Sequence, residues 1–148
     1  MRALGSEIEV AAGLIFRGGR LLVAQRRQGD HLGGLWEFPG GKRVAHETFE
    51  ECLRRELKEE LGVEVEVGEL MGTVRHAYPE KQVLLKFFRC LLKEGEPRPL
   101  DSHALAWIRA ADLPDYAFPA ADAALIEQLQ STAAWWETDV SGPDQRPP

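Results

Sequence analysis

The stretch GGKRVAHETFEECLRRELKEELGV, residues 40–63, holds a glycine pair followed by the strongest helix signal in the chain. Thr48 and Glu51 form a T-x-x-E capping box, so we expect the helix to begin directly after Thr48. Gly62 supplies a C-terminal stop. Apolar residues recur at every fourth position and form one stripe: Phe49, Leu53, Leu57 and Leu61. The stretch therefore predicts an amphipathic helix with one face packed on a core.

Three acids of this helix, Glu56, Glu59 and Glu60, stand at positions i, i+3 and i+4. Side chains at these spacings share one side of a helix, with Cβ atoms roughly 5–6 Å apart. Glu56 and Glu60 also border the apolar stripe, so we expect them to be half-buried and to need a compensating cation. Oxygen ligands favour Mg²⁺ or Mn²⁺ over zinc. The alternative is a solvated acidic face, which is the commoner meaning of E-x-x-E-E alone.

The surroundings of the acids favour the metal interpretation. Gly40 and Gly41 precede the helix by a short loop, where a backbone carbonyl can turn toward the cluster. Glu47 and Arg55 carry opposite charges eight residues apart and are suited to tie this loop to the helix. Phosphate chemistry uses such a site, because Mg²⁺ bridges polyphosphate oxygens and activates water for attack on phosphorus.

The rest of the chain predicts further strands and a last helix. Upstream, apolar runs at 8–16 and 21–25 read as a hairpin turned at Gly18-Gly19, and a polar loop leads to a short strand that breaks at Pro39. Downstream we expect strands at 63–67, 70–78, 82–92 and 103–109, a helix at 122–136 and a frayed tail at 141–148. The order of strands, helix, strands and helix indicates an α+β layer fold in one domain, residues 1–140.

Composition limits the classes of function. The chain has 148 residues and a formal net charge of −6, which disfavours stable binding to nucleic acid or to an anionic membrane. Its two cysteines, Cys52 and Cys90, lie in apolar patterns, so we expect buried free thiols and a reducing compartment. The N-terminus lacks an apolar signal region, and no apolar run is long enough to span a membrane. A cytoplasmic protein without membrane association is the expectation.

The helix and its loop resemble the Nudix box, G-x5-E-x7-R-E-U-x-E-E-x-G-U, in which U is a bulky aliphatic residue. Each fixed position is filled at the correct spacing, by Gly41, Glu47, Arg55, Glu56, Leu57, Glu59, Glu60, Gly62 and Val63. The resemblance runs roughly from residue 10 to residue 129, and within the family the chain is most similar to MutT-like members. It implies an α/β/α sandwich with a mixed β-sheet between helices. It also implies hydrolysis of a nucleoside diphosphate linked to another group.

The resemblance implies roles for the residues of the box. The metal would be held by Glu56, Glu59, Glu60 and the carbonyl of Gly40. These three glutamates would also be the catalytic set, with Glu56 as the first choice for the base. Glu47 and Arg55 would form a structural ion pair.

The loop and the later part of the chain depart from the pattern. In the loop, Val44 and His46 replace the usual acid and glycine. Asp101, in PLDSH, is the best match to a further metal-binding carboxylate, and a turn-capping aspartate is its alternative.

The nucleotide contacts implied by the resemblance involve Arg26, Lys42, Phe38 and Tyr78. Lys42 would lie near the phosphates, and Arg26 would contact the nucleotide unless it is simply solvated. Tyr78 would stack on the base, an interaction of roughly 1–3 kcal/mol, or pack in its turn. Phe38 would line the same pocket or belong to the core.

Asp122, in FPAAD, would open the last helix and read the edge of the base. Capping that helix is its simpler role. As an acceptor it suits the amino group of cytosine, and in a protonated state it can donate to an oxidised guanine. Both 8-oxo-dGTP and CTP or dCTP therefore stay open as substrates.

The function implied is a Mg²⁺-dependent enzyme, with Mn²⁺ as a possible substitute, acting as a monomer or homodimer. It would cleave a nucleoside triphosphate to the monophosphate and pyrophosphate, in sanitation of the nucleotide pool. One alternative is a non-catalytic module that reads lesions, as in adenine glycosylases, but those modules lack the catalytic glutamates that this chain has. Another is a hydrolase of ADP-ribose, dinucleoside polyphosphates or an RNA 5′ end, for which no insert or basic stretch gives support.

Overall fold

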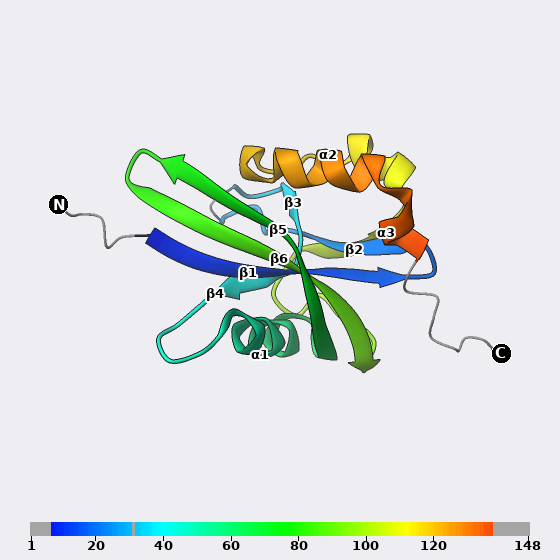
Figure 1. The fold of residues 1–148 in the computed structure, drawn as a ribbon, viewed down its shortest axis with the longest axis horizontal. Helices are drawn as coiled ribbons and strands as arrows, with labels where there is room; N and C mark the ends of the chain where they lie inside the picture. Colours follow the sequence, from blue (N-terminus) through cyan, green and yellow to red (C-terminus); the bar gives the residue numbers. More distant parts are fainter. Residues whose placement is uncertain (1–6, 31, 138–148) are drawn as a thin grey trace.

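A computed structural model describes residues 7–30 and 32–137, which form a mixed β-sheet with helices on both faces (Figure 1). The described sheet has seven strands in the order β3-β2-β1-β6-β5, with β4 paired to β1 and β7 paired to β2. The elements are β1 (Glu7–Arg17), β2 (Arg20–Gln25), β3 (Trp36–Glu37), β4 (Gly40–Lys42), α1 (Phe49–Leu61), β5 (Glu64–Tyr78), β6 (Lys81–Glu94), β7 (Ala104–Ile108), η1 (Ala110–Asp115), η2 (Ala120–Asp122), α2 (Ala123–Ser131) and α3 (Ala133–Glu137). The predicted α+β fold is confirmed, while the tail predicted at 141–148 lies outside the described residues.

Strand β1 is the centre of the sheet. It runs parallel to β6 and antiparallel to β2 and β4. Its hairpin with β2 turns at Gly18 and Gly19, whose φ angles of 59° and 77° lie in the left-handed region that glycine adopts readily. The hairpin prediction is therefore confirmed.

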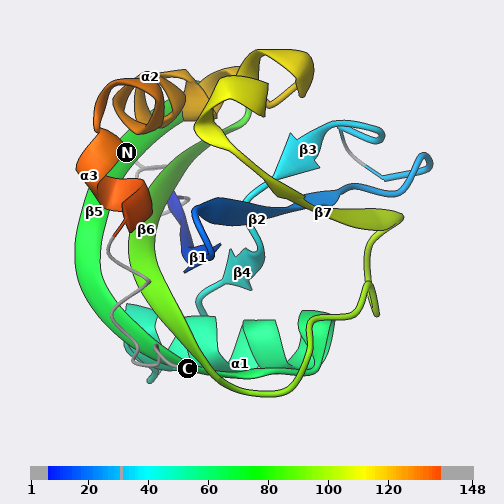
Figure 2. The same cartoon turned by 90° about the vertical axis from the view of Figure 1, so that its right-hand side faces the viewer.

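Alternate residues of β1 enter two separate cores. Ala12, Leu14 and Phe16 join the core beneath α2, while Ala11 and Ile15 join the core beneath α1. This separation follows from the two-residue period of a strand, which sends successive side chains to opposite faces of the sheet. Figure 2 shows α1 and α2 on these opposite faces.

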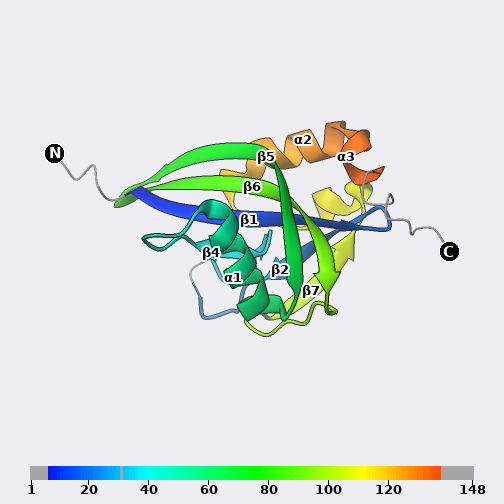
Figure 3. The same ribbon diagram turned by 60° about the horizontal axis from the view of Figure 1, so that its bottom comes forward.

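Helix α1 forms as its sequence predicts. Thr48 is the N-cap, and both hydrogen bonds of the capping box with Glu51 are present. Gly62 ends the helix in the left-handed conformation, with φ 73°. Leu53, Leu57 and Leu61 are buried, and the helix packs against β1, β4 and β5 (Figure 3).

The structure corrects one strand prediction and adds a strand to another. The segments expected at 63–67 and 70–78 are one strand, β5, in which two register shifts between Val67 and Gly72 absorb extra residues. The short strand predicted to break at Pro39 does so, and after the break the chain forms a second short strand with a different neighbour. There β3 pairs with β2, and β4 pairs with β1.

The helix expected at 122–136 is also divided. The turn η2 precedes α2, and Thr132, with φ −121° and ψ 79°, separates α2 from α3. The 3-10 helix η1 was not expected from the sequence. Both cysteines are buried free thiols, as predicted. Across residues 7–30 and 32–137, no helix is long and apolar enough to cross a membrane.

Candidate active site

The glycine pair before α1 allows a very close approach of backbone and side chain. Strand β4 pairs with β1 so tightly that a Cβ atom on Gly40 would lie 2.0 Å from the carbonyl oxygen of Ala11. A Cβ atom on Gly41 would lie 2.2 Å from Cδ of Glu56. The glycines are therefore required by space, since neither has a positive φ.

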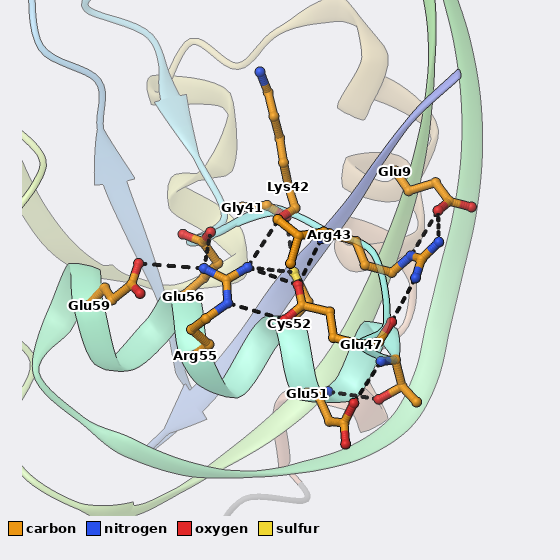
Figure 4. Close-up of polar contacts among 12 residues, drawn as sticks. Glu9, Gly41, Lys42, Arg43, Glu47, Glu51, Cys52, Arg55, Glu56 and Glu59 are labelled. Carbon is orange, nitrogen blue, oxygen red and sulfur yellow. Dashed lines mark hydrogen bonds and ion pairs between the residues drawn. The ribbon is translucent and has the colours of Figure 1, made fainter. Parts of the chain in front are cut away.

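The contact between Glu47 and Arg55 is present and joins the loop to α1 (Figure 4). Arg55 donates from Nε and Nη2 to the two carboxylate oxygens of Glu47, at 3.2 and 2.9 Å. These bonds, together with one from the backbone N–H of Val44, lower the pKa of Glu47 to about 2. Arg55 thus holds a carboxylate that stays ionised over the physiological range.

Arg55 does more than pair with Glu47. Its Nη1 atom donates to Glu56 at 2.9 Å and lies 3.6 Å from Glu59, and its Nη2 atom donates to the carbonyl of Lys42 at 3.2 Å. One guanidinium group therefore contacts three carboxylates and the end of β4. It supplies part of the positive charge that the acidic helix requires.

The three acids of α1 differ in their surroundings. The side chain of Glu56 is 17% exposed and that of Glu59 is 61% exposed, so Glu59 lies on the solvent side of the cluster. Burial, and then the charges of Glu56 and Glu37, raise the pKa of Glu60 well above its usual range. The half-buried position predicted for Glu56 and Glu60 is thus confirmed.

The donor set fits a divalent cation of the hard type. Within the described residues no three His, Cys, Asp or Glu side chains already form a metal-binding cage. Glu60, however, is a carboxyl group whose ionised form is disfavoured by burial and by its acidic neighbours. A bound cation would reverse that preference, and the available donors are carboxylate and carbonyl oxygens, which suit magnesium or manganese.

A cavity of about 370 Å³ opens beside this cluster, between the loop after β2, the β5–β6 turn and η2. Residues from β1, β2, β4, the end of α1, the β5–β6 turn and η2 line it, whereas Glu56 and Glu59 do not. The predicted site residues among them are Arg26, Phe38, Gly40, Lys42, Glu60, Tyr78, Asp101 and Asp122. The structure therefore brings all of the proposed nucleotide contacts to one place, next to the acidic helix.

Arg26 is held by a partner that the sequence did not suggest. Its Nη1 atom donates to Glu37 Oε1 at 2.7 Å. Burial raises the pKa of Glu37, against the opposing effect of Arg26. Glu37 lies in β3 and lines the cavity. In the sequence, its one distinguishing feature was its place as an acid between two aromatic residues.

Asp122 is buried, with 6% of its surface exposed, and faces the cavity. It stands at the N-cap position of α2, yet its side chain makes no capping hydrogen bond. The capping interpretation is therefore wrong. Burial, and then the charge of Glu37, raise the pKa of Asp122 to about 7, so the group can serve either as a donor or as an acceptor near neutral pH.

The remaining contacts combine packing with exposure to the cavity. Phe38 is 5% exposed and stacks on Phe118 with ring centroids 5.2 Å apart, so it belongs to the core and to the cavity wall together. The Tyr78 ring lies 5.9 Å from Nζ of Lys81, which also lines the cavity. Lys81 was not singled out from the sequence.

The other two residues lie at the cavity rim. Lys42 extends away from α1, as Figure 4 shows. Asp101 is exposed and lies 3.5 Å from Nη2 of Arg27.

The molecule is an α+β sandwich in which an acidic helix lies beside a cavity lined by charged and apolar side chains, an arrangement suited to a phosphoanhydride hydrolase. The NUDIX domain family matches residues 11–128 of the chain. The chain therefore belongs to the Nudix family, whose members are hydrolases that generally use divalent metal ions.

The similarity to named relatives covers most of the chain. A Mycobacterium tuberculosis protein named "Putative 8-oxo-dGTP diphosphatase 2" is 42% identical over 134 residues, covering 88% of this chain and 94% of that protein. The CTP pyrophosphohydrolase of Escherichia coli K12 is 34% identical over 127 residues, covering 86% of this chain and 94% of that protein. The solution structure of the E. coli ORF135 protein superposes with a TM-score of 0.76 at 32% identity, covering 88% of this chain and 93% of that one.

Proposed function

We propose that this protein is a magnesium-dependent hydrolase that cleaves a nucleoside triphosphate to the monophosphate and pyrophosphate. It would act in the cytoplasm, as a monomer or homodimer, on the free nucleotide pool. The substrate we place first is an oxidised purine nucleotide of the 8-oxo-dGTP type. The observation that carries the proposal is one cavity that joins Glu60, at the acidic helix, to the buried Asp122.

The proposed site residues form two groups, one at the acidic helix and one in the cavity beside it. Glu56, Glu59, Glu60, the Gly40 carbonyl and Asp101 would hold the metal, which would supply positive charge to the phosphates and lower the pKa of bound water. Glu56 is the candidate base, because it is partly buried and fixed by Arg55. Manganese would be an effective substitute, since it accepts the same oxygen donors.

The cationic and aromatic residues would bind the rest of the nucleotide. Lys42 and Arg26 would contact the phosphates, and the Arg26–Glu37 pair would fix the direction of the guanidinium group. Tyr78 would stack on the base, and Phe38 would close the apolar wall of the pocket. The net charge of −6 is unsuited to stable nucleic acid binding and supports a free nucleotide as the substrate.

A second candidate is CTP or dCTP, which the same aspartate favours. In its ionised state, Asp122 accepts a hydrogen bond from the amino group of cytosine, whereas in its neutral state it donates to a carbonyl of an oxidised guanine. A relative named CTP pyrophosphohydrolase adds support for this candidate. A non-catalytic reading module is disfavoured by the complete set of box glutamates.

The test is a panel of nucleotides assayed with Mg²⁺: 8-oxo-dGTP, dGTP, dCTP, CTP, ADP-ribose and a dinucleoside polyphosphate. We expect the highest kcat/KM for 8-oxo-dGTP, with pyrophosphate rather than phosphate released. Highest turnover of dCTP or CTP would select the second candidate. Preference for ADP-ribose or for the dinucleotide would overturn both.

A further inference from the structure

A chain of charged hydrogen bonds runs from β1 to the acidic helix through Glu9, Arg43, Glu47 and Arg55 (Figure 4). Arg43 donates from Nε to Glu9 Oε1 at 2.8 Å, and its Nη2 atom contacts the same oxygen. Its Nη1 atom donates to the backbone carbonyl of Glu47 at 2.7 Å. The backbone N–H of Arg43 also donates to the carbonyl of Glu9 at 2.8 Å. Arg43 therefore ties the loop after β4 to the central strand.

Glu47 continues the chain toward the catalytic acids. Its backbone is held by Arg43, while its carboxylate accepts hydrogen bonds from Val44 N–H and from Arg55. Arg55 in turn donates to Glu56 at 2.9 Å. The place of Glu56 thus depends on Glu47, and the place of Glu47 depends on both arginines.

The loop between Arg43 and Glu47 buries none of its own side chains. Val44, Ala45 and His46 are all exposed. His46 has a φ of 73°, a left-handed backbone that is unfavourable for a residue with a Cβ atom. A loop with few buried contacts opens readily unless both of its ends are fixed. The Glu9–Arg43 pair is only about 30% exposed, so water and salt screen it less than a fully exposed pair.

We propose that Arg43 and Glu9 are positioning residues for the hydrolytic reaction, holding Glu47 and through it the Arg55–Glu56 pair. The inference rests on the proposed function, in which Glu56 is base and metal ligand. Arg43 fills an open position of the box pattern, and Glu9 lies outside the box. Neither residue lines the cavity, so their loss should lower kcat and leave KM nearly unchanged.

The first test compares Arg43→Met with Arg17→Met. Arg17 is a matched control, because it donates twice to Glu96, at 3.0 Å each, lies over the Trp107 ring and does not line the cavity. We expect Arg43→Met to lower kcat on the order of 10-fold, with KM within about twofold of the unmodified protein. Arg17→Met should leave both constants unchanged.

The second readout requires no nucleotide. The Val44 amide donates to the Glu47 carboxylate, so its hydrogen exchange, measured by NMR, reports whether the loop is fixed. Exchange should be on the order of 10-fold faster in Arg43→Met and unchanged in Arg17→Met, while the Leu14 amide in the core strand stays protected in both. Equal kcat and equal Val44 exchange in the two variants would overturn the proposal.

If Arg43→Met fails to fold, Glu9→Gln tests the proposal instead, because glutamine keeps the shape of the Glu9 side chain and removes its charge. We expect the same pattern with a smaller effect, and normal values of kcat and Val44 exchange would overturn the proposal. If the unmodified protein hydrolyses none of the nucleotides in the panel, the proposed function fails. The exchange measurements would still decide whether Arg43 and Glu9 fix the loop.

Discussion

The carboxyl group of Glu56 lies directly against the Cα atom of Gly41. A methyl group on that glycine would be 2.2 Å from Glu56 Cδ and 2.4 Å from its Oε1. Glu56 is also bonded to Arg55, so the carboxyl group has little freedom to withdraw. The position of the proposed base is therefore set by the absence of a side chain on a neighbouring strand.

Gly41→Ala should displace Glu56 and lower kcat on the order of 100-fold, because small misplacements of a catalytic group have large effects on rate. Gly29→Ala is the matched control, since a Cβ atom there meets nothing within 4 Å. Steady-state kinetics on both variants provides the measurement. Full activity in Gly41→Ala would show that Glu56 tolerates displacement and would argue against its role as base.

Glu56→Gln and Glu59→Gln should each lower kcat by roughly 10²–10⁴ while the fold stays intact. Both substitutions keep the size of the side chain and remove one charge from the acidic cluster. Glu50→Gln, on the exposed first turn of α1, should change activity little. Steady-state kinetics measures kcat, and circular dichroism shows whether the fold is intact. Turnover retained in Glu56→Gln or Glu59→Gln would remove that residue from the catalytic set.

Asp122→Asn should change how stability depends on pH. The folded protein holds the Asp122 proton up to about pH 7, whereas the unfolded chain releases it near its ordinary pKa of 3.8. Between these values the folded state binds more protons, so rising pH removes stability, and the loss levels off above pH 7. Asparagine has no proton to lose, so the variant should gain relative stability across this range, by up to about 4 kcal/mol.

Urea unfolding at several pH values measures this difference. The raised pKa values of Glu37 and Glu60 also make stability fall with rising pH. They do so in both proteins, so their effect largely cancels when the two free energies of unfolding are subtracted. Asp115→Asn, at an exposed aspartate, is the control and should show no such trend. A difference between Asp122→Asn and the unmodified protein that stays flat with pH would contradict the buried, neutral state of Asp122.

His46→Gly should leave the protein as stable as before or stabilise it by up to about 1 kcal/mol. The left-handed backbone costs a residue with a Cβ atom about 1–2 kcal/mol, part of which is offset by the greater freedom of glycine in the unfolded chain. Ala45→Gly, at the neighbouring residue without positive φ, should instead destabilise by about 0.4–1 kcal/mol, because glycine increases the freedom of the unfolded chain. Thermal unfolding of the two variants should therefore move in different directions, and a clear loss in His46→Gly would contradict the assigned strain.

The part of the fold that could be predicted from sequence is the part that local patterns determine. Thr48, Glu51 and Gly62 define both ends of α1 through contacts within a few residues, and the structure has them as expected. The two strands predicted in place of β5 failed because bulges depend on the partner strand, which a single segment does not reveal. The break at Pro39 was predicted, whereas the strand that follows it depends on pairing with β1.

The candidate site shows the same division. The acids at helical spacing could be identified along the chain, whereas Glu37 and Lys81 required the folded cavity to bring them beside the others. The bridging role of Arg55 was only partly visible, because its contacts with Glu59 and Lys42 depend on how one side chain is turned. Asp122 was identified, yet its freedom from capping appeared only in the structure.

The location of α1 and α2 on opposite faces of the sheet has an evolutionary consequence (Figure 2). The proposed metal ligands other than Asp101 all precede Gly62, while the proposed selectivity for the base comes from Asp122, about sixty residues later. Under the proposed function, mutation of the segment around Asp122 would change the preferred nucleobase and leave the metal ligands of α1 unchanged. A chimera that exchanges residues 117–128 with those of a relative of different preference would transfer the choice of base without transferring the catalyst.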